Sequence, residues 1–321
     1  MHKEERADPC EESAIPHCAS GIRRARYSIA FLGNYTKDTI VSASGTRVVD
    51  GGGFNYGAHA AAATTGQDGS PLWVAAITRL AREDWRIVER LEGLGVDVLA
   101  RETPLSTCLS LVYPNANPDE RMIYVASSAG TFTVDQAAEV EAEAFVLNPS
   151  FRGEVGLDVM EALAAREVKI AIDVQGWVRV EREGLLAYQE WPDAPLFLQH
   201  VSIVKADAVE AGWLTGTQEI RQAARLMAEM GPDEVVMTHR DGILLYAGGQ
   251  FYETGFYPAS LVGRSGRGDT CLGSYVSKRL SAPPGEAMIW AAALTSLKME
   301  AEGPFRRTAE AVEQLIRERY S

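Results

Sequence analysis

The chain has 321 residues, of which 46% are hydrophobic and 23% are charged, and its formal net charge is −13. This length suits one large α/β domain or two smaller ones, and the composition is that of an ordinary globular protein. The acidic balance argues against nucleic acid or an anionic membrane as the main partner, because such partners require clustered Lys and Arg. Any bound phosphate must therefore be held by backbone amides and a few local cations.

The beginning of the chain differs from the rest. Residues 1–26 are polar and charged, with no periodicity and no apolar core of a signal peptide, so we expect a flexible extension. Residues 27–321 are expected to form a single ordered domain. No apolar run approaches the ~20 residues that span a bilayer. The 4 cysteines are scattered, which argues against a disulfide framework and favours a cytoplasmic protein.

In chain order, the first half predicts strands, helices and two hairpins. A short apolar strand at 28–33 ends in a glycine, and the β-branched runs of 39–53 surround a Ser-Gly turn. Residues 108–126 form a second strand–turn–strand unit, with a turn rich in Pro and Asn. Together the hairpins predict one small β layer, a lid formed by about 36–53 and 105–126. The elements expected between them are helices at 57–66 and 84–94 and strands at 72–78 and 96–100.

The second half alternates more regularly between strands and helices. Thr217 is expected to cap a helix whose apolar residues fall on one face. Such alternation predicts an α/β fold with a central, mostly parallel sheet covered by helices on both faces. Ligands of such sheets bind beyond the carboxyl ends of the strands. The expected strands are 144–150, 168–176, 202–207 and those within 233–256, and the expected helices are 156–166, 269–281, 286–302 and 308–319.

The stretch GRGDTCLGSYV at 266–276 places glycines at the start of a helix. There, successive backbone N–H groups converge and the helix dipole adds partial positive charge, which predicts an anion site. Asp269 does not fit a simple anion site, since a carboxylate repels a phosphate. It either acts as a base for an attacking hydroxyl or simply caps the helix. An integrin-type role for Arg-Gly-Asp would require an extracellular loop tip, which this context does not favour.

The GRGD tetrapeptide resembles the GAGD signature of the ribokinase-like (PfkB) carbohydrate kinases, with Arg267 in place of Ala. The resemblance spans residues 28–319 and includes further segments in the order of the family. It implies a ribokinase-like fold with a β lid and ATP-dependent phosphorylation of a sugar or polyol hydroxyl. The segments that carry it are GNYTKD (33–38), GGGFNYGAHAAAATTG (51–66), KADAVEAGWLTG (205–216), MTHRDGILLYAGG (237–249) and SLKMEAEGPF (296–305).

The resemblance also implies roles for individual residues. Asp269 would be the general base, and the amides of Gly266, Arg267 and Gly268 would form the anion hole. Arg264 stands where the family has Thr, and it could contact the donor phosphates, a charged part of the substrate, or surface carboxylates. The residues implied to bind substrate hydroxyls are Asn34, Asp38, Gly52, Gly53 and Asn55, with Arg264 beside them.

On the donor side, the resemblance implies Mg²⁺ bridging the ATP oxygens. Glu210, together with Asp207 in place of the usual Asn, would organise the metal through water. The residues implied to contact ATP are Lys205, Thr238, Gly242 and Ser296. DVQGWVRV at 173–180 resembles the myo-inositol kinase branch more than ribokinase itself.

Two alternatives remain open at this point. A nucleoside kinase of the same fold would need an aromatic slot, which Phe54 and Tyr56 could supply. A catalytically silent nucleotide or sugar sensor is favoured by the changes around GRGD and disfavoured by the retained Asp269. A homodimer that pairs through the lid strands is a further expectation.

Overall fold

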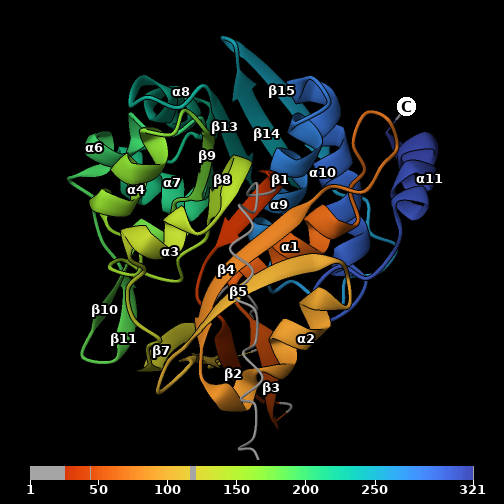
Figure 1. The fold of residues 1–321 in the computed structure, drawn as a ribbon. Coiled ribbons are helices and arrows are strands. Elements are labelled where there is room, and N and C mark those ends of the chain that lie inside the picture. The colour runs from red at the N-terminus through yellow and green to blue at the C-terminus, as the bar shows by residue number, and fades with distance from the viewer. Residues whose placement is uncertain (1–25, 44, 116–120, 321) are drawn as a thin grey trace, which may run out of the picture.

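The computed structural model describes residues 26–43, 45–115 and 121–320. The expected extension, apart from Arg26, and parts of the two lid turns lie outside the described residues. A nine-stranded sheet runs through the molecule in the order β15-β14-β13-β12-β9-β8-β1-β4-β5 (Figure 1). Its strands are β1 (Arg26–Leu32), β4 (Val74–Leu80), β5 (Val96–Glu102), β8 (Glu141–Leu147), β9 (Lys169–Asp173), β12 (Ile203–Asp207), β13 (Glu234–Thr238), β14 (Gly242–Ala247) and β15 (Gln250–Gly255).

Seven strands of this sheet, from β13 to β5, pair in parallel, and β14 and β15 add an antiparallel edge. The interior strand β1 is buried on both faces. Ile29 and Phe31 pack into one hydrophobic cluster, whereas Ala30 and Leu32 pack into another. Because successive side chains of a strand point to opposite faces, this division requires helices on both sides of the sheet. The expectation of a mostly parallel α/β sheet is confirmed.

Helices cover both faces of the large sheet, as Figure 1 shows. One face carries α3 (Val134–Ala138), α4 (Leu157–Ala164), α6 (Ala194–Leu198), α7 (Ala208–Thr215) and α8 (Ile220–Glu229). The other carries α1 (Gly53–Ala62), α2 (Arg86–Glu92), α9 (Arg267–Arg279) and α10 (Pro284–Met299), with α11 (Ala309–Arg319) packed outside α1 and α10. Within the described chain, no helix has the length and apolarity needed to cross a bilayer.

A second, six-stranded sheet lies at one end of the large sheet, in the order β10-β11-β7-β6-β2-β3 (Figure 1). Strands β2 and β6 pair in parallel, and the other neighbours are antiparallel. The two predicted hairpins therefore share one layer. Its strands are β2 (Thr36–Ser42), β3 (Gly45–Gly51), β6 (Thr107–Val112), β7 (Met122–Ser127), β10 (Arg179–Arg182) and β11 (Leu185–Tyr188).

Two local features differ from the sequence reading. The strand expected at 168–176 ends at Asp173, and a short helix, α5 (Gln175–Val178), leads into the β10–β11 hairpin. Glu183 and Gly184 turn this hairpin with positive φ angles of 52° and 84°. Thr217 is not the cap of α8: Glu219 occupies that position, and its carboxylate accepts the amides of Arg221 and Gln222.

Candidate active site

A pocket of about 590 Å³ opens at the carboxyl ends of the large-sheet strands, facing the smaller sheet. Three helices, α1, α7 and α9, begin at this pocket, because Gly53, Ala208 and Arg267–Asp269 all line it. The first N–H groups of a helix have no intrahelical partner and carry partial positive charge. The Asp207 carboxylate already caps the start of α7, so the open starts of α1 and α9 are the ones that make the pocket suitable for an anion.

The turn before α9 gives this anion site its shape. Gly266, the residue that precedes the helix, is left-handed, with φ 73°. A Cβ there would lie 2.3 Å from the Tyr56 ring, so only glycine fits. A Cβ on Gly268 would lie 2.6 Å from Lys205 Nζ. The absence of a side chain at Gly268 therefore lets that ammonium approach the helix start.

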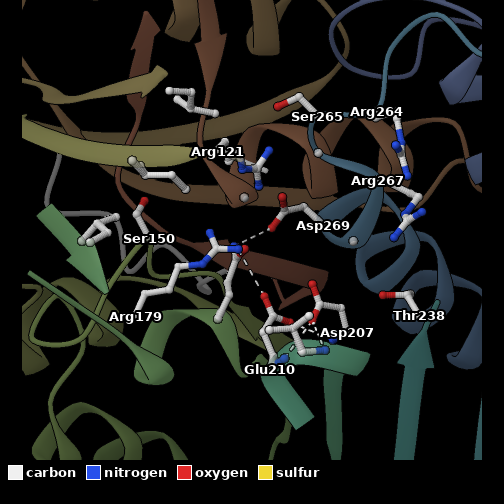
Figure 2. Close-up of a pocket in the computed structure, with 18 of the residues that line it drawn as sticks. Arg121, Ser150, Arg179, Asp207, Glu210, Thr238, Arg264, Ser265, Arg267 and Asp269 are labelled. Atoms are coloured by element: carbon white, nitrogen blue, oxygen red, sulfur yellow. Dashed lines mark hydrogen bonds and ion pairs between the residues drawn. The ribbon is translucent and has the colours of Figure 1, made fainter. Parts of the chain in front are cut away.

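Asp269 lies in the first turn of α9 and lines the pocket, with Arg264 and Arg267 to one side of it and Arg179 to the other (Figure 2). Gln175 Nε2 donates a hydrogen bond to Asp269 Oδ1 at 3.2 Å. Burial raises the pKa of the Asp269 carboxyl, and the Lys205 and Arg179 charges oppose that rise. A raised pKa makes this carboxylate a stronger proton acceptor than an exposed aspartate.

Glycine at the start of α1 brings Asp269 close to the opposite wall. A Cβ on Gly53 would lie 2.5 Å from Asp269 Oδ1 and 2.6 Å from Asn148 Cβ. Gly52 precedes it with φ 93°, a conformation that also favours glycine. The Gly-Gly pair therefore joins the sheet to α1 without filling the space beside the carboxylate.

Asp38, on β2, provides a second carboxyl at the pocket. It is 8% exposed, and burial raises its pKa to about 6, against the lowering effects of a Thr36 hydrogen bond and Arg121. Its Oδ1 has no hydrogen-bond partner among the described residues. Since a buried acceptor without a partner costs about 1–3 kcal/mol, this atom is suited to a ligand hydroxyl.

A network of buried ions lies beneath the pocket. Lys205 Nζ contacts Asp173 Oδ2 at 2.9 Å and Glu210 Oε2 at 3.3 Å, and Arg179 contacts Glu210 Oε1 at 3.2 Å. Burial raises the pKa of Asp173 to about 7, and the charge of Lys205 opposes this rise. Burial disfavours the charged form of Lys205, but the carboxylates outweigh it, so the pKa of Lys205 is raised. Against the same effect of burial, the carboxylate pairing also raises the pKa of Arg179, so Lys205 and Arg179 both remain charged beside the pocket.

The residues expected to organise a metal fit only indirect binding. Both oxygens of Glu210 already accept hydrogen bonds, from Arg179 on one side and from Lys205 and the Asp207 amide on the other. Asp207 lines the pocket while its Oδ1 caps α7. The described residues contain no group of three or more His, Cys, Asp or Glu placed to hold a metal ion. A divalent ion here would depend on water and on oxygens of the donor.

Most residues expected at the site line the pocket, but four do not. Asn34 donates to Glu154 and to the Gly130 carbonyl, and Asn55 is fully buried. Position 242 requires glycine because of strand pairing, since a Cβ there would lie 2.0 Å from the Thr254 carbonyl oxygen on the neighbouring strand. Ser296 bonds the Tyr257 amide and the Tyr320 hydroxyl. The expected residues that do line the pocket are Asp38, Gly52, Gly53, Lys205, Asp207, Glu210, Thr238, Arg264, Gly266, Arg267, Gly268 and Asp269.

The sequence reading missed several residues that the fold brings to the pocket. Arg179 follows α5 and Arg121 precedes β7, and Figure 2 shows both near Asp269. Gln175 and Ser150 also come from connections between strands. The one signal for Arg179 in the sequence was an arginine between the apolar residues of WVRV, since buried charges are rare and are in most cases paired. Its partner in the structure is Glu210.

Comparisons with known proteins identify the family to which the chain belongs. A scan against models of protein families finds no match, and no curated protein matches significantly. A pyrophosphate-dependent kinase in the ribokinase family, complexed with a pyrophosphate analogue and myo-inositol, is 30% identical, with TM-score 0.78 over 89% of this chain and 99% of that one. A pyrophosphate-dependent myo-inositol-1 kinase, converted into a myo-inositol-3 kinase by two substitutions, is 31% identical, with TM-score 0.79 over 91% and 100%.

More distant structures share the fold. The ribokinase of Arabidopsis thaliana, complexed with ribose and ATP, is 18% identical, with TM-score 0.71 over 91% of this chain and 99% of that one. At this identity the likeness concerns the fold alone.

Proposed function

Because the chain belongs to the ribokinase family of kinases, we propose that it phosphorylates a hydroxyl of a small polyol, with Asp269 as the general base. The observation that carries this proposal is the position of the Asp269 carboxyl. It lies in a polar pocket, at the start of α9, and its hydrogen bond comes from the neutral amide of Gln175. A base held in a permanent ion pair would not be available for an attacking hydroxyl.

The reaction follows from the arrangement around this carboxyl. The acceptor hydroxyl gives its proton to Asp269 as its oxygen attacks the terminal phosphorus of the donor. A bond forms between that oxygen and phosphorus, and the bond from phosphorus to the bridging oxygen of the donor breaks. The amides of Gly266, Gly268 and Asp269 would face the phosphoryl group in transit, where fixed donors stabilise its charge. The Arg267 amide instead bonds the Arg264 carbonyl at 3.2 Å. Arg264 and Arg267 flank the path of the leaving phosphate.

A divalent ion such as Mg²⁺ would be held by the donor oxygens and by waters beside Asp207, and it would neutralise charge on the donor. The protein residues contribute more directly. Lys205 and Arg179 place fixed positive charge under the transferring group. The smaller sheet faces the acceptor across the pocket and excludes water, which would otherwise accept the phosphoryl group.

The acceptor end of the pocket has two contrasting walls. Asp38, Gln175 and the start of α1 offer hydrogen-bonding groups, whereas the smaller sheet offers an aliphatic surface. This combination suits a ring with hydroxyl groups at its edge and C–H groups on its face, and myo-inositol, the ligand of the first neighbour, has that form. The aliphatic residues are Leu109, Leu111, Ile123 and Leu186.

The nucleoside kinase alternative loses its supporting residues. Phe54 is fully buried and lies outside the pocket lining. Tyr56 is 3% exposed and packs against Gly266, so its ring face is already covered. Neither ring offers a surface on which a base could stack.

The donor that the sequence reading implied is ATP, but the pocket favours pyrophosphate. Around the start of α9 the lining offers charge and hydrogen bonds rather than an apolar slot for a purine, whereas nucleotide sites are largely apolar. The closer neighbours in sequence are pyrophosphate-dependent. The lining residues at this end are Thr238, His239, Arg240, Arg264, Ser265 and Arg267.

The test compares both donors with a panel of inositols, pentoses, hexoses and nucleosides, with phosphorus NMR to detect the product. We expect a phosphorylated polyol and inorganic phosphate from pyrophosphate, and Asp269→Asn should lose at least about 100-fold in kcat. Asp241→Asn, an exposed change outside the pocket lining, is the control. Turnover with ATP alone would contradict the donor assignment, and Asp269→Asn with wild-type activity would contradict the general base.

A further inference from the structure

Lys298, on α10, is a buried lysine to which the proposed reaction gives no role. It is 2% exposed, and its Nζ donates to the carbonyl oxygens of Gly263, at 2.9 Å, and of Ser265. The ammonium also lies 5.3 Å from the centre of the Tyr56 ring. Both hydrogen-bond partners are main-chain oxygens rather than carboxylates. Since burying a charge is costly, this arrangement calls for a function.

The two carbonyls belong to the loop that leads into α9. In a trans peptide the C=O and the following N–H point in opposite directions. The Ser265 carbonyl points at Lys298, so the Gly266 amide, in the same peptide, points away from Lys298. In the same way, the Gly263 carbonyl points at Lys298 and the Arg264 amide points away. Arg264 and Gly266 both line the pocket. Lys298 thus faces the carbonyl side of a loop whose other side faces the donor.

The rest of the loop is held from the same direction. The amides of Val262 and Gly263 both bond the Met299 carbonyl at 2.9 Å, which ties the loop to the end of α10. Tyr56 packs on Gly266 from α1. Between these contacts, the Lys298 ammonium holds the two carbonyls. Burial lowers the pKa of Lys298 to about 8, against the raising effects of Glu302 and Asp269, so the charged form still predominates at neutral pH.

We propose that Lys298 is a positioning residue for phosphoryl transfer. Its ammonium keeps the Gly263 and Ser265 carbonyls turned inward, and this turns the Arg264 and Gly266 amides toward the donor. The inference rests on the proposed function, because it assigns those amides to the migrating phosphoryl group. If a neutral side chain replaced the ammonium, a peptide of the loop could turn over. A carbonyl oxygen would then face the phosphate where an N–H belongs, and it would repel the anion.

The experiment uses Lys298→Met, which keeps an unbranched side chain one atom shorter and without its charge, and Lys298→Ala with added ethylammonium. The matched control is Lys278→Met, since Lys278 also lies over an aromatic ring, 4.8 Å from Trp290, but belongs to the last turn of α9, at the opposite end of the helix from the loop. For Lys298→Met we expect kcat to fall at least about 100-fold, the cost of losing one fixed donor to a developing oxyanion. The KM for the polyol should stay within threefold, pyrophosphate affinity measured by calorimetry should fall, and ethylammonium should restore part of kcat to Lys298→Ala.

Several results would overturn the proposal. Wild-type kcat in Lys298→Met would do so, as would a loss of polyol affinity equal to the loss of kcat, or a failure of ethylammonium to rescue. If Lys298→Met does not fold, Lys298→Gln replaces it, and if neither folds, the lysine is structural and the proposal is wrong. Calorimetry measures pyrophosphate binding without turnover, so it separates this proposal from the proposed function. A wild-type protein that binds pyrophosphate but phosphorylates no polyol would contradict the proposed function, whereas the comparison of wild type with Lys298→Met would still test the loop.

Discussion

Replacing Gly53 with Ala tests whether the closeness of α1 to Asp269 matters for catalysis. The new Cβ would lie 2.5 Å from Asp269 Oδ1 and 2.6 Å from Asn148 Cβ. Ordinary contact begins at 3.4 Å, so the carboxylate must withdraw by about 0.9 Å if α1 stays in place. A misplacement of about 1 Å in a reacting group can cost about 100-fold in rate, and we expect a loss of that order in kcat for Gly53→Ala.

The same substitution should leave the fold intact. Gly53 is the first residue of α1, so the clash with Asn148 Cβ can be relieved by a small shift at this end of the helix. We therefore expect the melting temperature to change by only a few degrees while kcat falls. Pyrophosphate affinity should change much less than kcat, because the arginines and the glycine turn proposed to hold the donor belong to the start of α9.

Gly285→Ala provides the matched control for this prediction. Gly285 is the second residue of α10, and the nearest atom to a Cβ there is Tyr252 Cδ1, at 3.3 Å. Steady-state kinetics of both variants, at saturating polyol and pyrophosphate, measure the effect. If Gly53→Ala kept its kcat within threefold of wild type, the position of the carboxylate would not limit the reaction, and the geometric argument for Asp269 would fail.

Two further predictions concern the acceptor end of the pocket. Because the pKa of Asp38 is raised to about 6 from 3.8, the proton binds more tightly in the folded state, so Asp38 costs stability above pH 6. Asp38→Asn should therefore raise the melting temperature at pH 8 but not at pH 4. The same variant should bind the polyol more weakly in calorimetry, and an unchanged affinity would show that Asp38 does not contact the polyol. Leu111→Asn puts an amide into the aliphatic wall of the pocket. It should change which hydroxyl is phosphorylated, measured by NMR of the product, or lower kcat/KM for the polyol by at least about 10-fold. An identical product with identical kinetics would mean that this wall does not orient the ring.

The parts of the fold that the sequence predicted are those with local signals. The central strands are continuous apolar runs, and the helices that follow carry periodic apolar residues, so the large sheet could be read directly. The β10–β11 hairpin was missed because its residues, VRVEREGLLAY, interrupt an alternating pattern that predicted only a crossover. Its place in the smaller sheet depends on pairing with β7, a contact between segments distant in sequence. Local patterns carry no information about such a partner.

The site divides in the same way. Asp269 and its glycines were predictable because a helix start, a glycine turn and a carboxylate lie within four residues. Asn34 and Asn55 lie behind the lining of the pocket, and the sequence could not show this, because it depends on how the segments that hold them pack against the large sheet. The Oδ1 atoms of both residues have no partner among the described residues, so their contact with the substrate stays a prediction. Arg179 and Arg121 could not be assigned, because their proximity to Asp269 arises only when the smaller sheet lies across the strand ends.

The overall charge of the chain and the charge of its pocket have opposite signs, and this affects how a phosphate donor binds. A chain of net charge −13 repels an anion at long range, but at physiological salt charges more than about 8 Å apart are largely screened. Inside the pocket the donor instead meets the cations of Arg179, Lys205, Arg264 and Arg267 beside the open starts of α1 and α9, where low exposure weakens the screening. Added salt should therefore slightly ease the approach of pyrophosphate while it weakens binding much less than it would on an open basic surface. The acidic composition that argues against nucleic acid as a partner is thus compatible with a small, highly charged donor, because the pocket recognises it with local cations and fixed amides.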